Sequence, residues 1–68
     1  MSLKEYLDLH GWSVSDLARE SRISWEAANN AVQGKTIQRR TARDIAEALS
    51  AATGQRINVG DIVGLNFS

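Results

Sequence analysis

The 68-residue chain contains no cysteine and no proline, and its eight basic and eight acidic side chains cancel. Without cysteine, neither a disulfide nor a thiolate metal site can stabilise so short a chain. Stability must therefore come from close packing of its elements or from a partner subunit. Proline is the residue that most strongly interrupts helices, and its absence means that any part of the chain can form a helix.

The sequence also has little that could support catalysis. His10 is its one histidine, so neither a Cys/His pair nor a histidine-based metal cluster can be built. The carboxylates are spaced like helix caps and surface residues, and no glycine pattern resembles a phosphate-binding loop. We therefore expect a protein that is not an enzyme, with no catalytic residue, no metal and no cofactor.

Long apolar stretches are missing as well. No run approaches the roughly 18 to 20 residues that a membrane-spanning helix needs. Residues 2–5 are helix-like and lack the apolar region of a secretory signal peptide. The sequence predicts a cytoplasmic protein that does not contact a membrane, with one domain over residues 1–68.

Residues that start and stop helices divide the chain into five short helical segments. A Ser or Asn followed three residues later by an acidic residue has the spacing of a capping box. This spacing occurs at Ser2–Glu5, Ser13–Asp16 and Asn58–Asp61. Ser24 is expected to cap the third helix, and the fourth begins between residues 37 and 42. Glycine readily adopts the left-handed backbone that ends helices, and is expected to do so at Gly11, Gly34 and Gly54.

Apolar and small residues recur in these segments at the spacing of helices that bury one face. They are Leu3, Tyr6 and Leu7; Val14, Leu17 and Ala18; Ala28, Ala31 and Val32; and Ala42, Ile45, Ala46 and Leu49. No segment alternates apolar and polar residues for long enough to form a convincing strand. The predicted fold class is therefore all-α, a bundle of five short helices.

The second and third predicted helices lie close together in the sequence, separated only by residues 21–24. Their facing sides carry the small residues Ala18, Ala28 and Ala31, which allow two short helices to cross closely and steeply. A helix-turn-helix has this geometry and presents its second helix to the major groove of DNA. We expect a helix-turn-helix over about residues 14–33.

This region resembles the Cro/repressor-type helix-turn-helix family of small prokaryotic and phage regulators. The likeness is carried by Leu17-Ala18-Arg19-Glu20-Ser21-Arg22-Ile23-Ser24, by Ala28, Ala31 and Gly34-Lys35, by Ile45-Ala46-Glu47-Ala48-Leu49, and by Asn58-Val59-Gly60-Asp61-Ile62. It extends over about residues 3–65. The resemblance implies a lambda-repressor-like domain that binds double-stranded DNA sequence-specifically and regulates transcription.

The resemblance also implies roles for individual residues. Base edges would be contacted from the outer face of the third helix by Trp25, Glu26, Asn29 and Asn30. Asparagine can pair with adenine, and glutamate can accept a hydrogen bond from cytosine. Phosphates would be bound by Lys35, Arg39 and Arg40 after the third helix, and by Ser13 and Ser15 at the start of the second.

Each of these residues also has a simpler interpretation. The two asparagines are equally compatible with an ordinary polar surface, Glu26 with a residue that complements the helix dipole, and Ser13 with a cap. Trp25 is more typical of packing or of a protein-binding surface. The basic residues in 35–43 on their own are compatible with a solvated surface. The alternative function is therefore a protein-interaction module, similar to an antitoxin that binds a toxin, with little DNA binding.

A neutral monomer offers few phosphate contacts, and two half-sites about one helical turn apart would compensate. We therefore expect a homodimer whose interface includes Ile62, Leu65 and Phe67, because apolar residues so near the chain end should be poorly covered. The residues exposed around the third helix distinguish between the two candidate functions. Cations beside the third helix favour DNA, whereas an apolar patch around Trp25 favours a protein partner.

Overall fold

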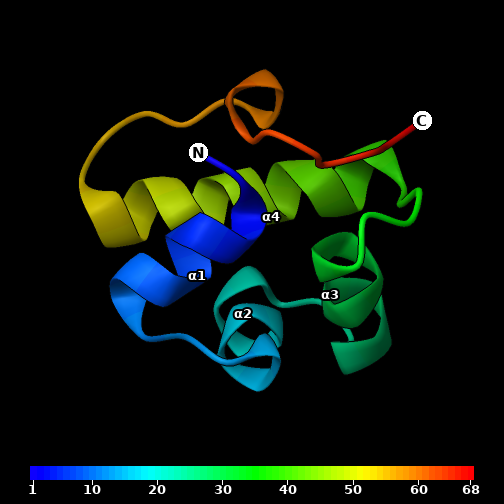
Figure 1. Cartoon of the computed structure of the whole chain (residues 1–68), viewed down its shortest axis with the longest axis horizontal. Helices are drawn as coiled ribbons and strands as arrows, with labels where there is room; N and C mark the ends of the chain where they lie inside the picture. Colours follow the sequence, from blue (N-terminus) through cyan, green and yellow to red (C-terminus); the bar gives the residue numbers. More distant parts are fainter.

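A computed structural model of the chain describes all 68 residues and contains four α-helices and one 3₁₀ turn (Figure 1). The elements are α1 (Leu3–His10), α2 (Val14–Ser21), α3 (Trp25–Val32), α4 (Arg39–Thr53) and the 3₁₀ turn η1 (Val59–Asp61). The three short helices lie on one side of α4, which among them packs chiefly against α2, and the segment after α4 folds back along that helix (Figure 1). No helix is both long enough and apolar enough to cross a membrane.

The predicted all-α class is confirmed, but the count of five helices is wrong. At the fifth segment, the Asp61 carboxylate accepts the Asn58 N–H at 3.0 Å, as the capping pattern predicted. The helix stops after one 3₁₀ turn, because Ile62 takes an extended backbone and the Val63 N–H binds the Met1 carbonyl at 2.9 Å. A bond to the distant N-terminus thus replaces the one that would have continued the helix.

The helix starts predicted from serine are confirmed. The hydroxyls of Ser2 and Ser13 accept the N–H groups of Glu5 and Asp16, each at 3.2 Å. In return, each carboxylate accepts the N–H of its serine at 2.9 Å. The Ser24 hydroxyl accepts the N–H three residues later, at 3.1 Å. Local hydrogen bonds therefore set where α1, α2 and α3 begin.

Left-handed residues cap three of the helices, and the predicted left-handed Gly34, with φ of 80°, directly follows the cap of α3. Gly11 and Gly54 cap α1 and α4 with φ of 67° and 72°, as predicted. The end of α2 has no glycine, and Arg22 adopts φ of 58° there. This conformation costs a non-glycine residue about 1 kcal/mol, but it turns the chain sharply enough for the Ile23 N–H to bind the Ala18 carbonyl at 3.0 Å. The tight connection between α2 and α3 depends on this turn.

Acid should weaken the two capping boxes. Hydrogen bonds from the backbone and side chain of Ser2 lower the pKa of Glu5 below its ordinary 4.5, and those from Ser13 lower the pKa of Asp16 below 3.8. Since both folded-state pKa values lie below the unfolded ones, this stabilisation is complete above the ordinary values and is lost as the pH falls through the folded values.

We expect the thermal midpoint, followed by circular dichroism, to fall as the pH is lowered below about 4.5. A Glu5→Gln/Asp16→Asn variant keeps the shape of both caps but has no carboxyl to titrate, so its midpoint should fall less. An equal fall in both proteins would contradict the role of these carboxylates.

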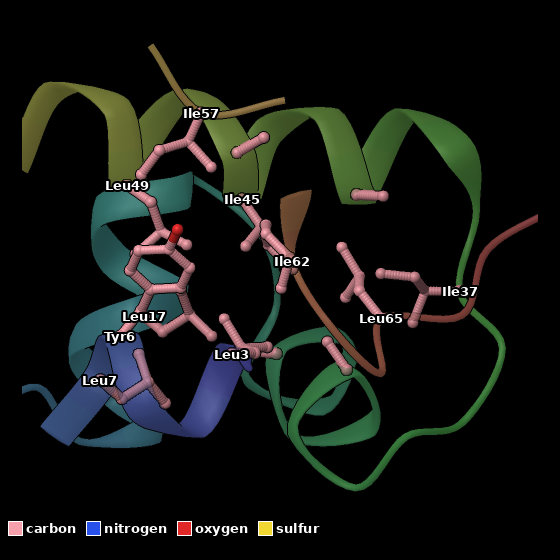
Figure 2. Close-up of a cluster of buried hydrophobic side chains, with 14 of the residues drawn as sticks. Leu3, Tyr6, Leu7, Leu17, Ile37, Ile45, Leu49, Ile57, Ile62 and Leu65 are labelled. Atoms are coloured by element: carbon pink, nitrogen blue, oxygen red, sulfur yellow. The ribbon is translucent and has the colours of Figure 1, made fainter. Parts of the chain in front are cut away.

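The core lies between α4 and the three short helices and is closed by the returning segment (Figure 2). Leu17, Ile45 and Leu49 are its fully buried large side chains. Four further members come from outside the α-helices: Ile37, Ile57, Ile62 and Leu65. Just over a quarter of the fifteen-residue core therefore comes from loops, so the short helices are held together by irregular segments as well as by one another.

The predicted dimer interface is wrong for two of its three residues. Ile62 and Leu65 are only 3% and 8% exposed, because the returning segment inserts them into the chain's own core (Figure 2). Phe67 is half-buried against the same core. The large apolar side chains that remain exposed are Met1, Leu9, Trp25 and Val63.

Candidate nucleic-acid interface

The contact between α2 and α3 is the most extensive of any pair of elements in the chain. Ala18 of α2 and Ala28 and Ala31 of α3 are all buried, and Ala28 is completely so. Side chains of this size let the two helix backbones approach closely. The helix pair spans residues 14–32 and presents the other face of α3 to solvent.

The outer face of α3 is polar and carries the residues predicted to contact bases. Trp25 and Glu26 are exposed, and Asn29 and Asn30 are partly exposed. Gln33, just after the helix, is exposed as well and lies seven positions after Glu26, on the same face. Gln33 is not among the residues predicted from the sequence to contact bases, although its helical spacing from Glu26 could have indicated it.

A cleft of about 530 Å³ runs beside this face, and we call it the α3 cleft. It is lined by Arg22, Ile23, Ser24, Glu26, Ala27, Asn30, Thr36, Ile37, Gln38, Arg40, Thr41 and Asp44. Two arginines and two carboxylates therefore share it, and none of these four side chains forms an ion pair within the chain. The positive and negative side chains of the cleft are equal in number, so it has no surplus of positive charge.

The structure separates the three cations predicted to bind phosphates. Arg40, in the first turn of α4, lines the α3 cleft. Lys35 lies three residues after the end of α3, and its N–H binds the Asn30 carbonyl at 2.9 Å, which places it at the end of the outer face. Arg39 lines a different pocket, on the other side of α4. Two of the three cations thus lie beside α3, and the third points elsewhere.

The two serines predicted to bind phosphates lie at the start of α2. Ser15 is exposed in the first turn, and Ser13 is the N-cap. The carboxylate of Asp16 already accepts the Ser13 N–H at 2.9 Å and pairs with Arg19 at 3.0 Å. A phosphate at this helix start would therefore depend chiefly on the serine hydroxyls and on the remaining free N–H groups.

The polar face of α3, backed by α2 across small residues, is the arrangement that a helix-turn-helix requires. The sequence matches the family of Cro/C1-type HTH DNA-binding domains over residues 2–68, almost the entire chain. The chain belongs to this family. No curated protein and no solved structure matches it. The resemblance drawn from the sequence is confirmed, and the family makes DNA the partner of this Cro/C1-type domain.

In this Cro/C1-type domain, the last residues hold the loop between α3 and α4. The Asn66 side chain donates to the Gly34 carbonyl at 2.7 Å, and the Asn66 carbonyl accepts the Ile37 N–H at 2.9 Å. The Ser68 carbonyl accepts the N–H of Arg39 at 3.2 Å. This last bond serves the start of α4, whose N-cap residue makes no side-chain bond. The loop that carries Lys35 is thereby fixed at both of its ends.

Replacing Asn66 by alanine should loosen this loop more than it destabilises the Cro/C1-type domain. We expect a loss of about 1 kcal/mol or less in the free energy of unfolding, because one hydrogen bond at an exposed site is removed. Amide hydrogen exchange at Ile37 and Arg39 should become severalfold faster. Gln55→Ala, which removes an amide side chain from an exposed position, is the matched control and should leave both exchange rates unchanged.

Proposed function

We propose that this domain binds double-stranded DNA sequence-specifically, with α3 in the major groove, and regulates transcription from that site. The observation that supports this most strongly is the polar outer face of α3, backed by the closely packed α2. The major groove is about 12 Å wide and accepts one helix, and the residues facing its floor can read base edges by hydrogen bonding.

The base contacts that we propose come from Trp25, Glu26, Asn29 and Asn30, together with Gln33. The amide side chains of Asn and Gln can donate to and accept from adenine at once, and the Glu26 carboxylate can accept from cytosine N4. Trp25 lies at the edge of this face with 54% of its surface exposed, where it can cover a sugar or a thymine methyl group. Specificity would therefore come mainly from neutral amides.

The phosphate contacts that we propose come from two parts of the helix-turn-helix region. Lys35 and Arg40 follow α3 in the chain and lie beside it, and Ser13 and Ser15 lie at the start of α2. Two cations per monomer is a small number for a DNA-binding surface, and Glu26 and Asp44 offset them in the α3 cleft. We therefore propose a homodimer, acting in the cytoplasm, that binds two half-sites about one helical turn apart.

The second candidate function is binding of a protein partner, such as a toxin, at the same face. The exposed Trp25 favours it, because large aromatic side chains are enriched in protein interfaces. The polar residues that surround Trp25 on α3 support DNA over this alternative.

A salt series of binding to a fluorescently labelled random duplex tests the proposal. Lys35→Gln/Arg40→Gln should flatten the slope of log K against log salt concentration by about two, since each phosphate contact contributes about 0.9. Arg43→Gln/Arg56→Gln removes the same charge from exposed positions that do not line the α3 cleft, and should leave the slope unchanged.

Two outcomes would count against the proposal. Equal flattening in both double variants would show that overall charge, not the position of Lys35 and Arg40, governs binding. If the wild type did not bind the duplex even at low salt, the second candidate function, binding of a protein partner, would be favoured. Trp25 would then be the first residue to replace.

A further inference from the structure

A second pocket lies between α4 and the segment that returns along it, with a volume of about 520 Å³. It is lined by Arg39, Arg43, Ala46, Glu47, Ser50, Arg56, Ile57, Asn58 and Val59, and we call it the arginine pocket. It shares no residue with the α3 cleft. On α4, the α3 cleft is lined by Arg40, Thr41 and Asp44 and the arginine pocket by Arg39, Arg43, Ala46, Glu47 and Ser50, so the two sites use different faces of that helix.

Three arginines line this pocket, from two segments of the chain. Arg39 and Arg43 are one helical turn apart on α4, and Arg56 comes from the facing segment. None of the three forms an ion pair within the chain, whose two ion pairs both belong to Arg19. Glu47 is the only carboxylate in the lining, which leaves the pocket with a net charge of about +2 at neutral pH.

The wall that carries Arg56 is fixed to α4. The Ser50 hydroxyl accepts the Ile57 N–H at 2.9 Å and donates to the Ala46 carbonyl at 2.8 Å. Ile57 is also buried in the core, only 8% exposed. The next residue along this wall, Asn58, also lines the pocket. The backbone on both sides is therefore held in place before any ligand arrives, which reduces the entropy lost on binding.

We propose that the arginine pocket binds a small free anion that carries phosphate groups, of the pyrophosphate class. Guanidinium groups recognise phosphate oxygens through paired, charge-assisted hydrogen bonds, and three of them around one pocket match an anion with more than one negative charge. The half-buried Val59 and the backbone at Ile57 give such a ligand a surface to lie on. The α3 cleft, which lies beside the proposed DNA-reading face, shares no residue with this pocket, so we assign the anion to a free ligand and not to the DNA backbone.

Binding of sodium pyrophosphate, measured by isothermal titration calorimetry at constant ionic strength, tests the proposal. The wild type should bind it saturably with one site per chain. Arg43→Gln and Arg56→Gln should each weaken binding about tenfold, because each removes charge-assisted hydrogen bonds to the ligand. Lys4→Gln removes the same charge from an exposed position on α1 and should bind like the wild type. Circular dichroism checks that all four proteins are folded.

Three results would overturn the proposal. One is the absence of saturable pyrophosphate binding by the wild type. Another is an equal loss of pyrophosphate affinity in Lys4→Gln, which would indicate that binding depends on the overall charge of the protein and not on this pocket. The third is a flatter salt slope for duplex binding in Arg43→Gln, which would make the DNA backbone the occupant. Because pyrophosphate binding is measured without DNA, this inference can stand if the proposed DNA binding fails, and it can fail if DNA binding stands.

Discussion

Replacing Leu17 by alanine should lower the free energy of unfolding by about 2–5 kcal/mol. Leu17 has no exposed surface and is one of the three fully buried large side chains of the core (Figure 2). Removing its side chain loses both the burial of its methyl groups and the contacts of the atoms around the cavity that remains. A domain of this size has a total stability of roughly 3–10 kcal/mol, so this one change could leave much of the protein unfolded.

Urea denaturation followed by circular dichroism measures this loss. Leu9→Ala makes the same chemical change at a position on α1 that is 65% exposed, and should alter the stability by no more than about 0.5 kcal/mol. Similar losses in the two variants would contradict the arrangement of α1 and α2 around the core.

Enlarging Ala28 to leucine should destabilise the domain by about 1–3 kcal/mol or more, because the site has no space for the added atoms. Ala28 is completely buried where α3 packs against α2. The two helices must move apart, or the new side chain must adopt a strained rotamer. Since α3 presents the polar face to DNA, its displacement should also weaken DNA binding at a temperature where the variant is still folded.

Ala52→Leu is the matched control for this change. Ala52 is exposed near the end of α4, and alanine and leucine have similar helix propensities, so its stability and DNA affinity should stay close to those of the wild type. Full tolerance of leucine at Ala28 would show that α2 and α3 do not need small residues between them. If a destabilised Ala28→Leu variant retained its DNA affinity, DNA binding would not depend on the close packing of α3 against α2.

Much of the local structure was readable from the sequence because it depends on residues three or four positions apart. The capping boxes at Ser2 and Ser13, and the glycine ends at Gly11 and Gly54, behave as their types and spacing predict. The same spacing located the buried faces and hence the all-α class. The start of α4 could not be placed, since Gln38 supplies no side-chain cap and the Arg39 N–H is bound instead by Ser68.

The candidate site was predictable in its residue types and only partly in its arrangement. Helical spacing places Asn29 and Asn30 on the outer face of α3, and the structure agrees. Arg39 and Arg40 are neighbours in the sequence, yet they line different pockets. Successive residues of a helix differ by about 100° in direction, so the two could face apart as soon as α4 packed with one side inward.

The sequence by itself determined the class of the domain, three helix starts, the helix-turn-helix and the family to which the chain belongs. Only the tertiary structure decided the course of residues 55–68. From the sequence, this segment was expected to form a fifth helix and to leave its apolar residues uncovered. In the folded chain, Ile62 and Leu65 complete the core, and Asn66 binds the loop after α3. Their partners lie tens of residues away, and the free energy of burying apolar surface there exceeds that of one more short helix.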